Sequence, residues 1–106
     1  METKQKGDIA EQAVILEALK REFAVLKPLG DWLPYDLVFD SNGVLVKIQV
    51  KGAWFDKKSG NYVVDNRRTK TNRRRMIRSY YTPSDFDFAI VYVKERGCFY
   101  IFPTDV

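Results

Sequence analysis

The chain has 106 residues, of which 45% are hydrophobic and 30% charged, a composition typical of one globular domain. It contains no histidine and a single cysteine, Cys98. This excludes histidine-ligated metal centres, a Ser-His-Asp triad, an internal disulfide and a cysteine metal cluster. The sequence shows neither an apolar run long enough to cross a bilayer nor a signal peptide. We therefore expect a soluble protein of the reducing cytoplasm without a membrane partner.

The formal net charge of +4 is concentrated in one segment. Residues 67–78 hold seven of the 18 basic residues and no acid, so the rest of the chain carries 11 bases and 14 acids. Such asymmetry indicates a polyanionic partner met along one surface. The simpler alternative is a solvated surface segment with no partner.

The first predicted element is a helix from Asp8 to about Glu22, with Asp8 as its N-cap. Its buried stripe is expected from the helical spacing of four apolar residues. They are Ile9, Leu16, Leu19 and Phe23. Glu11 lies at the rim of that stripe, three residues after Asp8. Helix rules alone favour a capping box, in which the Glu11 side chain folds back on the N-cap backbone.

Residues 34–51 predict a β-hairpin, preceded by a short extended piece at residues 25–29 and a loop. Asn42-Gly43 suits a two-residue turn because both central residues need a positive φ. In that register Ser41 faces Val44, and Asp36 lies opposite Gln49. A loop one residue longer would put Asp36 on the other face, so the apolar pattern selects this register.

Strand alternation then places Asp36, Gln49 and Lys51 on one face of the hairpin. The other face collects the apolar residues expected in the core: Tyr35, Leu37, Phe39, Val44, Val46, Ile48 and Val50. Because Val38 and Leu45 share the polar face, we expect the first helix to cover part of it and to leave a partly enclosed cleft. The alternative is an ordinary solvated face of an antiparallel hairpin.

The second hairpin strand is predicted to run on into Trp54-Phe55, followed by a turn at residues 56–60. The later predicted strands are residues 61–66, 88–93 and 98–102. The basic segment between them reads as an irregular stretch or a short helix. Asp85 and Asp87, just before the fourth predicted strand, are expected to have a structural role.

Four ordered blocks resemble the PD-(D/E)xK nuclease superfamily, and most closely the homing endonucleases of cyanobacterial group I introns and their bacterial relatives. The blocks are GDIAEQA at residues 7–13, GDWLPYDLV at 30–38, IQVK at 48–51 and DFDFA at 85–89. In that branch Gln stands where most of the superfamily has Asp or Glu, as Gln49 does here. The resemblance implies an α/β fold with a restriction-endonuclease-like core. That core is an N-terminal helix packed on a small mixed sheet of about five strands with a central β-hairpin.

The resemblance also implies one nuclease domain over residues 1–106. Because relatives of this kind usually continue further, we expect the chain to lack a C-terminal extension.

The implied catalytic residues are Glu11, Asp36, Gln49 and Lys51, working with Mg²⁺, or Mn²⁺ as a substitute. Asp36, the Gln49 side-chain oxygen and the backbone carbonyl of Val50 would hold the metal, and Glu11 would reach it through water. Lys51 would contact the attacking water or stabilise the transition state. The neutral Gln49 removes one negative charge, so we expect weaker metal affinity. The resemblance favours this role of Glu11 over the capping box.

The implied partner is double-stranded DNA, contacted by basic and amide side chains after the central hairpin. The predicted contacts are Lys57, Lys58, Asn61, Asn66, Arg67, Arg68, Lys70, Asn72, Arg73, Arg74 and Arg75. Since two strands must be cut and one chain has one site, we expect a homo-oligomer. It would be a two-fold dimer of active sites, with a tetramer as the larger alternative.

The resemblance predicts a site-specific double-strand DNA endonuclease of the homing type, which hydrolyses phosphodiester bonds. Two alternatives stay open. One is a Holliday-junction resolvase-like nuclease, which shares the fold and the metal chemistry but recognises branched DNA. The other is a catalytically inactive DNA-binding module of the same fold.

Overall fold

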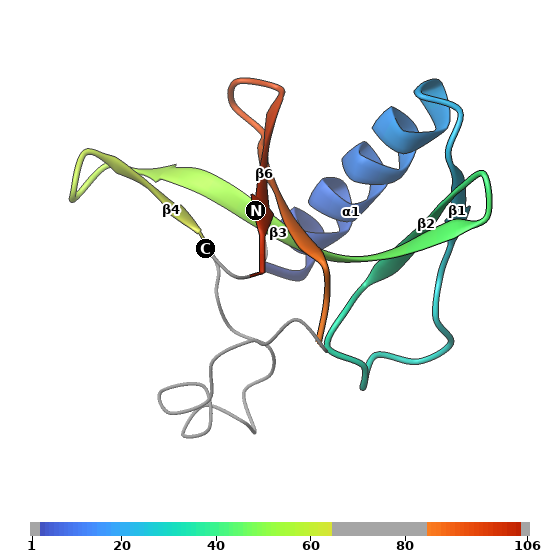
Figure 1. Ribbon diagram of the computed structural model, residues 1–106. Helices are drawn as coiled ribbons and strands as arrows, with labels where there is room; N and C mark the ends of the chain where they lie inside the picture. Colours follow the sequence, from blue (N-terminus) through green and yellow to red (C-terminus); the bar gives the residue numbers. More distant parts are fainter. Residues whose placement is uncertain (1–2, 65–84, 105–106) are drawn as a thin grey trace.

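The computed structural model describes residues 3–64 and 85–104. Within them a single helix packs on a six-stranded sheet. The elements are α1 (Thr3–Lys20), β1 (Ala24–Leu26), β2 (Leu37–Ser41), β3 (Val44–Asp56), β4 (Asn61–Val64), β5 (Phe88–Val93) and β6 (Cys98–Pro103). The sheet order is β1-β2-β3-β5-β6, and β4 pairs with β3 apart from this path. This confirms the predicted α/β fold, with β1 as a strand beyond the expected five (Figure 1).

The central hairpin has the predicted register. Ser41 pairs with Val44, and Leu37 pairs with Ile48. Asn42 and Gly43 both have a positive φ, of 52° and 87°, which is the backbone that a type I′ turn requires. The turn is closed further by the N–H of Gly43, which donates to Asp40 Oδ1 at 2.9 Å. Local turn chemistry therefore fixes the alignment of the two strands that carry the site.

The 13-residue strand β3 is the spine of the sheet (Figure 1). Its first half pairs with β2 and its last four residues pair with β4, both antiparallel. Between them, residues 48–53 pair with β5 in parallel, which makes the sheet mixed. Two parallel strands need a long connection, and the one from β3 to β5 runs through β4 and the segment that follows β4.

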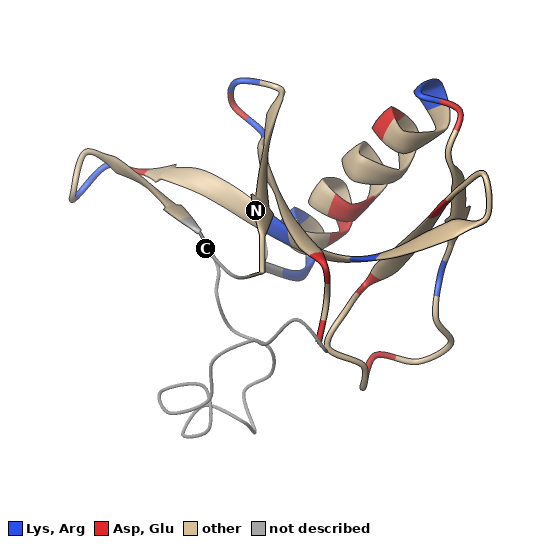
Figure 2. Cartoon of the chain, viewed as in Figure 1, with Lys and Arg blue, Asp and Glu red and all other residues tan. Residues whose placement is uncertain are grey.

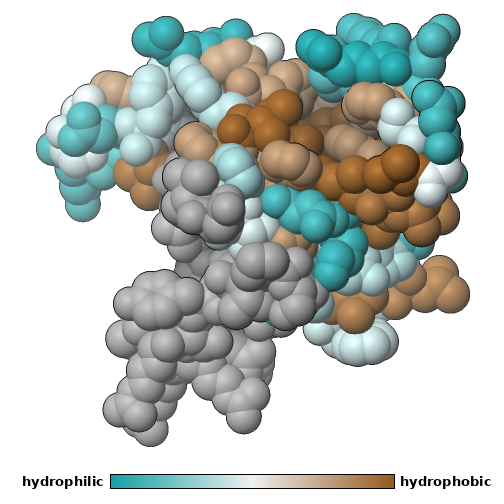
Figure 3. Space-filling view, viewed as in Figure 1, coloured by the Kyte–Doolittle hydropathy of each residue, from teal (hydrophilic) through white to brown (hydrophobic). Residues whose placement is uncertain are grey.

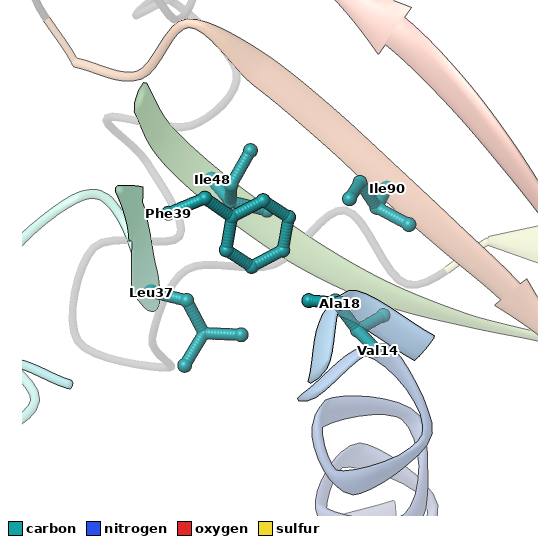
Figure 4. Close-up of a cluster of buried hydrophobic side chains, with 6 residues drawn as sticks. All are labelled: Val14, Ala18, Leu37, Phe39, Ile48 and Ile90. Carbon is teal, nitrogen blue, oxygen red and sulfur yellow. The ribbon is translucent and has the colours of Figure 1, made fainter. Parts of the chain in front are cut away.

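The main core lies between α1 and one face of the sheet (Figure 4). Its buried members are Val14, Ala18, Leu37, Phe39, Ile48 and Ile90. The helix supplies the smaller residues, and the large ones come from the two hairpin strands and, for Ile90, from β5. Leu37 is fully buried at its centre, so this residue contributes directly to the hydrophobic stabilisation of the fold.

The predicted buried stripe of the helix is wrong for its two leucines. Leu16 and Leu19 are 55% and 53% exposed, whereas the buried helical positions are Ala10, Val14 and Ala18. Small residues at spacings of four let the helix approach the sheet closely. A side chain placed at Gly52 of β3 would meet Ala10 at 3.7 Å. Close approach to β3 therefore decides which face of α1 is buried, and this approach favours small side chains over leucines.

The predicted helix start is also wrong, because α1 begins at Thr3 and Asp8 lies inside it. The early turns of α1 lie against β3. The backbone oxygen of Lys6 approaches Gly52, and the Lys6 ammonium lies 4.6 Å from the centre of the Trp54 ring. Such tertiary packing stabilises helical turns that local capping signals do not mark. Asp8 is therefore not an N-cap.

The helix covers the opposite face from the one we expected. It packs on the apolar face, through Leu37 and Ile48, whereas Gln49 and Lys51 alternate to the other side of β3. That side holds a smaller cluster formed by Ala53, Val91 and Val93. Val44, expected in the core, is 63% exposed because it stands at the turn end of the hairpin.

Outside these clusters a number of apolar side chains reach the surface. Figure 3 shows them in the middle of the visible face and over the β2–β3 hairpin. On β6 they include Tyr100, Ile101 and Phe102. No helix within residues 3–64 and 85–104 is both long and apolar enough to cross a membrane.

Asp87 ties three segments together at the beginning of β5. Its Oδ2 accepts the N–H of Lys47 at 2.8 Å, and its own N–H donates to the Lys47 oxygen at 2.9 Å. Its carbonyl oxygen accepts the N–H of Thr104 at 3.1 Å, and the Thr104 hydroxyl donates to the carbonyl of Phe86. These bonds fit the structural role predicted for Asp87.

Candidate active site

Asp36 stands immediately before β2, at the point where the hairpin ladder ends. Its N–H donates to the Ile48 oxygen at 2.8 Å, and its carboxylate Oδ2 accepts the N–H of Val50 at 2.7 Å. The carboxylate therefore lies along the edge of β3 beside Val50. In a longer β2, a backbone carbonyl would accept the N–H of Val50. Because the ladder between β2 and β3 ends at Leu37, the Asp36 carboxylate takes that role instead.

Gln49 and Lys51 flank Val50 on β3, and both are buried, each only 8% exposed. They are the only buried polar or charged residues in the described ranges. The confirmed register ends at the pair of Leu37 with Ile48, so the predicted pairing of Asp36 with Gln49 lies just beyond the ladder, where the Asp36 N–H donates to the Ile48 oxygen instead. In the parallel ladder Gln49 pairs with Ala89 and Lys51 with Val91, so β5 holds this part of β3 on one side, while the ladder with β2 has already ended at Ile48. A buried polar pair is costly and is not what an ordinary solvated face would show.

The charge of Asp36 is poorly compensated. Burial raises the pKa of Asp36 above its ordinary value, and the hydrogen bond from Val50 opposes this rise. The negative charge of Glu11 adds to the rise, while the ammonium groups of Lys51 and Lys27 lower the pKa. Four charged side chains from four separate segments therefore interact at this point.

Glu11 does not form the capping box. It lies in the interior of α1, and its side chain, 21% exposed, turns toward Lys27, whose Nζ is 2.5 Å from Glu11 Oε1. That oxygen is buried, and no well-directed hydrogen-bond donor of the described residues reaches it. Glu11 raises the pKa of Lys27, and Asp8 and Asp36 do so to a smaller extent. Glu11 is thus an acid held next to Asp36 and bridged by one lysine.

Lys27 is the member of this cluster that our sequence analysis missed. It directly follows β1, which pairs with β2 through Val25 to Phe39 and Leu26 to Val38. Continuing that register brings Lys27 next to the end of β2, where Asp36 stands. The sequence signal that could have located Lys27 was the short extended piece at residues 25–29. The strand formed there, β1, has three residues, which are too few to predict that it pairs with β2.

The donor atoms around Asp36 suit a hard divalent cation. No three His, Cys, Asp or Glu side chains gather as a ligand set in the described ranges. The two carboxylates that interact here, from Glu11 and Asp36, are oxygen ligands, and the amide oxygen of Gln49 is a third candidate, carried on the face of β3 that α1 does not cover. A carboxylate whose pKa is raised by burial would also be stabilised by an added cation. The residues present therefore fit Mg²⁺ or Mn²⁺.

The predicted DNA contacts fall into two groups. Lys57, Lys58 and Asn61 lie exposed in and beside the β3–β4 turn, and Figure 2 shows basic residues at the tip of this hairpin. The remaining predicted contacts lie outside the described residues: Asn66, Arg67, Arg68, Lys70, Asn72, Arg73, Arg74 and Arg75. The tip is therefore the part of the predicted surface whose geometry is described.

The β3–β4 hairpin is braced from its side. Phe55 and Tyr62 pack edge to face, with ring centres 5.4 Å apart. Arg96, in the turn between β5 and β6, donates from Nε to the Tyr62 hydroxyl at 3.2 Å. The aromatic contact thus joins the two strands of the hairpin, and Arg96, whose guanidinium also lies 5.6 Å from the centre of the Tyr62 ring, holds the hairpin to the β5–β6 turn.

Comparison with known proteins places this fold in a family. The profile of the family described as PD-(D/E)XK endonuclease matches residues 1–106. A search of curated proteins found no match. Among solved structures, "The structure of a bacterial homing endonuclease: I-Ssp6803I" is similar, with 57% sequence identity and a TM-score of 0.78. The match covers 98% of this chain and 67% of that chain. The chain therefore belongs to the PD-(D/E)XK endonuclease family.

Proposed function

We propose that this protein is a divalent-metal-dependent, site-specific endonuclease of the homing type that cuts double-stranded DNA. The observation that carries the proposal is the buried Gln49-Val50-Lys51 segment beside the Asp36 carboxylate. It occurs in a chain 57% identical to a bacterial homing endonuclease. An ammonium and an amide that are both withdrawn from water are costly for stability, and a catalytic role explains why they stand there.

We assign the metal to Asp36, Gln49 and the Val50 carbonyl, with Glu11 contributing through water. When bound, Mg²⁺, or Mn²⁺ in its place, neutralises charge that develops on the scissile phosphate. The hydrogen bond from Val50 N–H fixes the Asp36 carboxylate against the strand, so this ligand is already oriented. Gln49 adds an oxygen without adding charge, which keeps the negative charge of the site at two carboxylates.

Lys51 acts on the reacting groups. Its ammonium is buried on the same face of β3 as Gln49, where water and the phosphate must meet. There it orients the attacking water and stabilises the extra negative charge as the bond from water oxygen to phosphorus forms and the bond to the leaving oxygen breaks. Burial makes this interaction stronger than it would be in bulk water.

DNA binding is assigned to the basic surface that begins at the β3–β4 turn. Lys57 and Lys58 would contact phosphates and Asn61 a base edge, and the segment outside the described residues supplies the remaining arginines. Because each chain has one site, a two-fold dimer is needed for a double-strand cut, with a tetramer as the larger alternative. The cytoplasm is the assigned location.

The deciding experiment is cleavage of a plasmid that contains an intron-less homing site, with Mg²⁺ and with EDTA. A discrete pair of linear ends that requires the metal supports the proposal. Cleavage of four-way junctions in preference to the plasmid would replace it with a resolvase. DNA binding without cleavage, in a protein that binds neither Mg²⁺ nor Mn²⁺, would replace it with an inactive DNA-binding module.

A further inference from the structure

Lys27 is mostly exposed to solvent, yet its charge interacts with both carboxylates of the candidate site, Glu11 and Asp36. Its Nζ is 2.5 Å from Glu11 Oε1, and its charge also interacts with Asp36. The Glu11 side chain is 21% exposed, whereas that of Lys27 is 61% exposed. A largely buried acid is therefore paired with a cation that remains mostly in solvent.

The formal charges that act at Asp36, its own included, balance without any metal, and Asp8, which acts on Lys27, stands outside this set. Glu11 and Asp36 supply two negative charges, and Lys27 and Lys51 supply two positive ones. An acid in place of Gln49 would have left one negative charge over. With Gln49 neutral, a divalent cation enters a site whose carboxylates are already neutralised by Lys27 and Lys51. One of these lysines must move away from its carboxylate if the cation is to be held tightly.

Lys27 is the one that can leave at low cost. Its side chain follows an edge strand of three residues and projects into solvent. Lys51, in contrast, is buried on the central strand β3. A long lysine side chain in solvent regains rotamer freedom when its ion pair opens, and exposed pairs are weak.

We propose that Lys27 is an internal counter-cation that pairs with Glu11 in the metal-free protein and competes with the divalent cation for that carboxylate. This proposal rests on the proposed metal-dependent function. It makes Lys27 a determinant of metal affinity without making it a catalytic residue. By reciprocity, bound metal weakens the Lys27–Glu11 pair by the same factor by which the pair weakens metal binding.

The test is a calorimetric titration of the DNA-free protein with Mn²⁺ in low salt. We expect Lys27→Gln to lower the dissociation constant for Mn²⁺ roughly three- to fivefold, the size of one exposed ion pair. Lys27→Arg keeps the pair and should bind like the unaltered protein. Lys20→Gln, at the other end of α1, removes an exposed lysine remote from the site and is the matched control.

A double-mutant cycle separates competition at Glu11 from a general loss of positive charge. In a Glu11→Gln background, Lys27→Gln should change the dissociation constant much less, because only the weaker interaction of Lys27 with Asp36 remains. An equal effect in both backgrounds would overturn the proposal, as would unchanged or weaker Mn²⁺ binding by Lys27→Gln. Failure of the unaltered protein to bind Mn²⁺ would overturn both this inference and the proposed metal-dependent function.

Thermal unfolding provides an independent measurement. In EDTA, Lys27→Gln should melt at a lower temperature than the unaltered protein, because Glu11 loses its partner. In saturating Mn²⁺ the difference should shrink or reverse, since metal then occupies the carboxylate in both proteins. A difference of the same size under both conditions would show that Lys27 only supports the fold.

Discussion

Two parts of β3 differ in what they expose: a buried half, residues 48–53, which pairs with β5, and an open half, which leads into the β3–β4 turn. In the buried half, Ile48, Gln49 and Lys51 are each less than a tenth exposed. In the half that pairs with β4, Phe55 is 43% exposed and the following turn carries two exposed lysines. One strand thus combines a desolvated segment, suited to bond breaking, with an open segment, suited to contacting a large polyanion.

This difference shows how chemistry and recognition can share a strand without sharing residues. Charges that act on a phosphate gain strength when water is excluded. Charges that bind the DNA backbone must stay where they can release counterions. The predictions that follow test whether the two halves are separable.

The largest effect should come from the buried half. Lys51→Met should lower the cleavage rate by roughly a hundred- to a thousandfold, the cost of removing one charged group from a developing transition state. Asp36→Ala should abolish cleavage. DNA binding in a gel-shift assay should persist in both variants. Lys58→Met, in the open half, serves as the control and should cleave normally at saturating DNA. Full activity of Lys51→Met would end the assignment.

Stability should depend on side-chain burial in the β2–β3 hairpin in the same one-sided way. Leu37→Ala removes a fully buried side chain and should lower the free energy of unfolding by about 2–5 kcal/mol. Leu45→Ala, a matched leucine on β3 that is 60% exposed, should change it by less than about 0.5 kcal/mol. Urea denaturation followed by circular dichroism measures both. Equal losses would contradict the placement of the core.

The open half should control affinity and its dependence on salt. Replacing Lys57 and Lys58 together by Gln should weaken DNA binding and reduce the slope of log affinity against log salt by about two at most, since each phosphate that is no longer neutralised lowers it by about 0.9. The rate at saturating DNA should stay unchanged. Lys20→Gln is the control for removal of positive charge elsewhere. An unaltered salt slope in the double variant would remove the β3–β4 turn from the DNA interface.

The smallest effect concerns the pH dependence of stability in EDTA. Because the pKa of Asp36 is higher in the folded than in the unfolded chain, the folded chain binds that proton more tightly. The free energy of unfolding therefore falls as pH rises through the interval from the ordinary carboxyl pKa, about 4, to the raised value.

Asp36→Asn cannot ionise, so its stability relative to the unaltered protein should increase over that interval and then stay constant. Denaturant melts from pH 3 upward, compared between the two proteins, measure this difference. A difference that decreases with rising pH would contradict the raised pKa. A gain in stability with loss of cleavage would show that Asp36 is kept for chemistry.

The sequence was most informative where local rules and the site coincide. The Asn42-Gly43 turn and the strand alternation fix the hairpin register, because both depend on residues close in the chain. The extended β3 and the four ordered blocks completed the prediction of the fold.

The incorrect predictions share a physical cause. The helix start and its buried face depend on Gly52, which lies 42 residues after Ala10 and lets α1 approach β3 closely. Lys27 meets Glu11 only because β1 docks on β2. Contacts between distant segments override local signals, and no local pattern announces them.

The clasp made by Asp87 has a consequence for how target preference can change. Its hydrogen bonds to Lys47 and Thr104 fix the position of the chain where β5 begins. The alignment of β5 with β3 is therefore supported by contacts that do not involve the residues connecting β4 to β5. Under the proposed function, exchange of that arginine-rich connecting stretch should alter DNA binding and leave the groups proposed for cleavage unchanged. Retargeting by grafting would therefore begin after Val64 and end before Phe86.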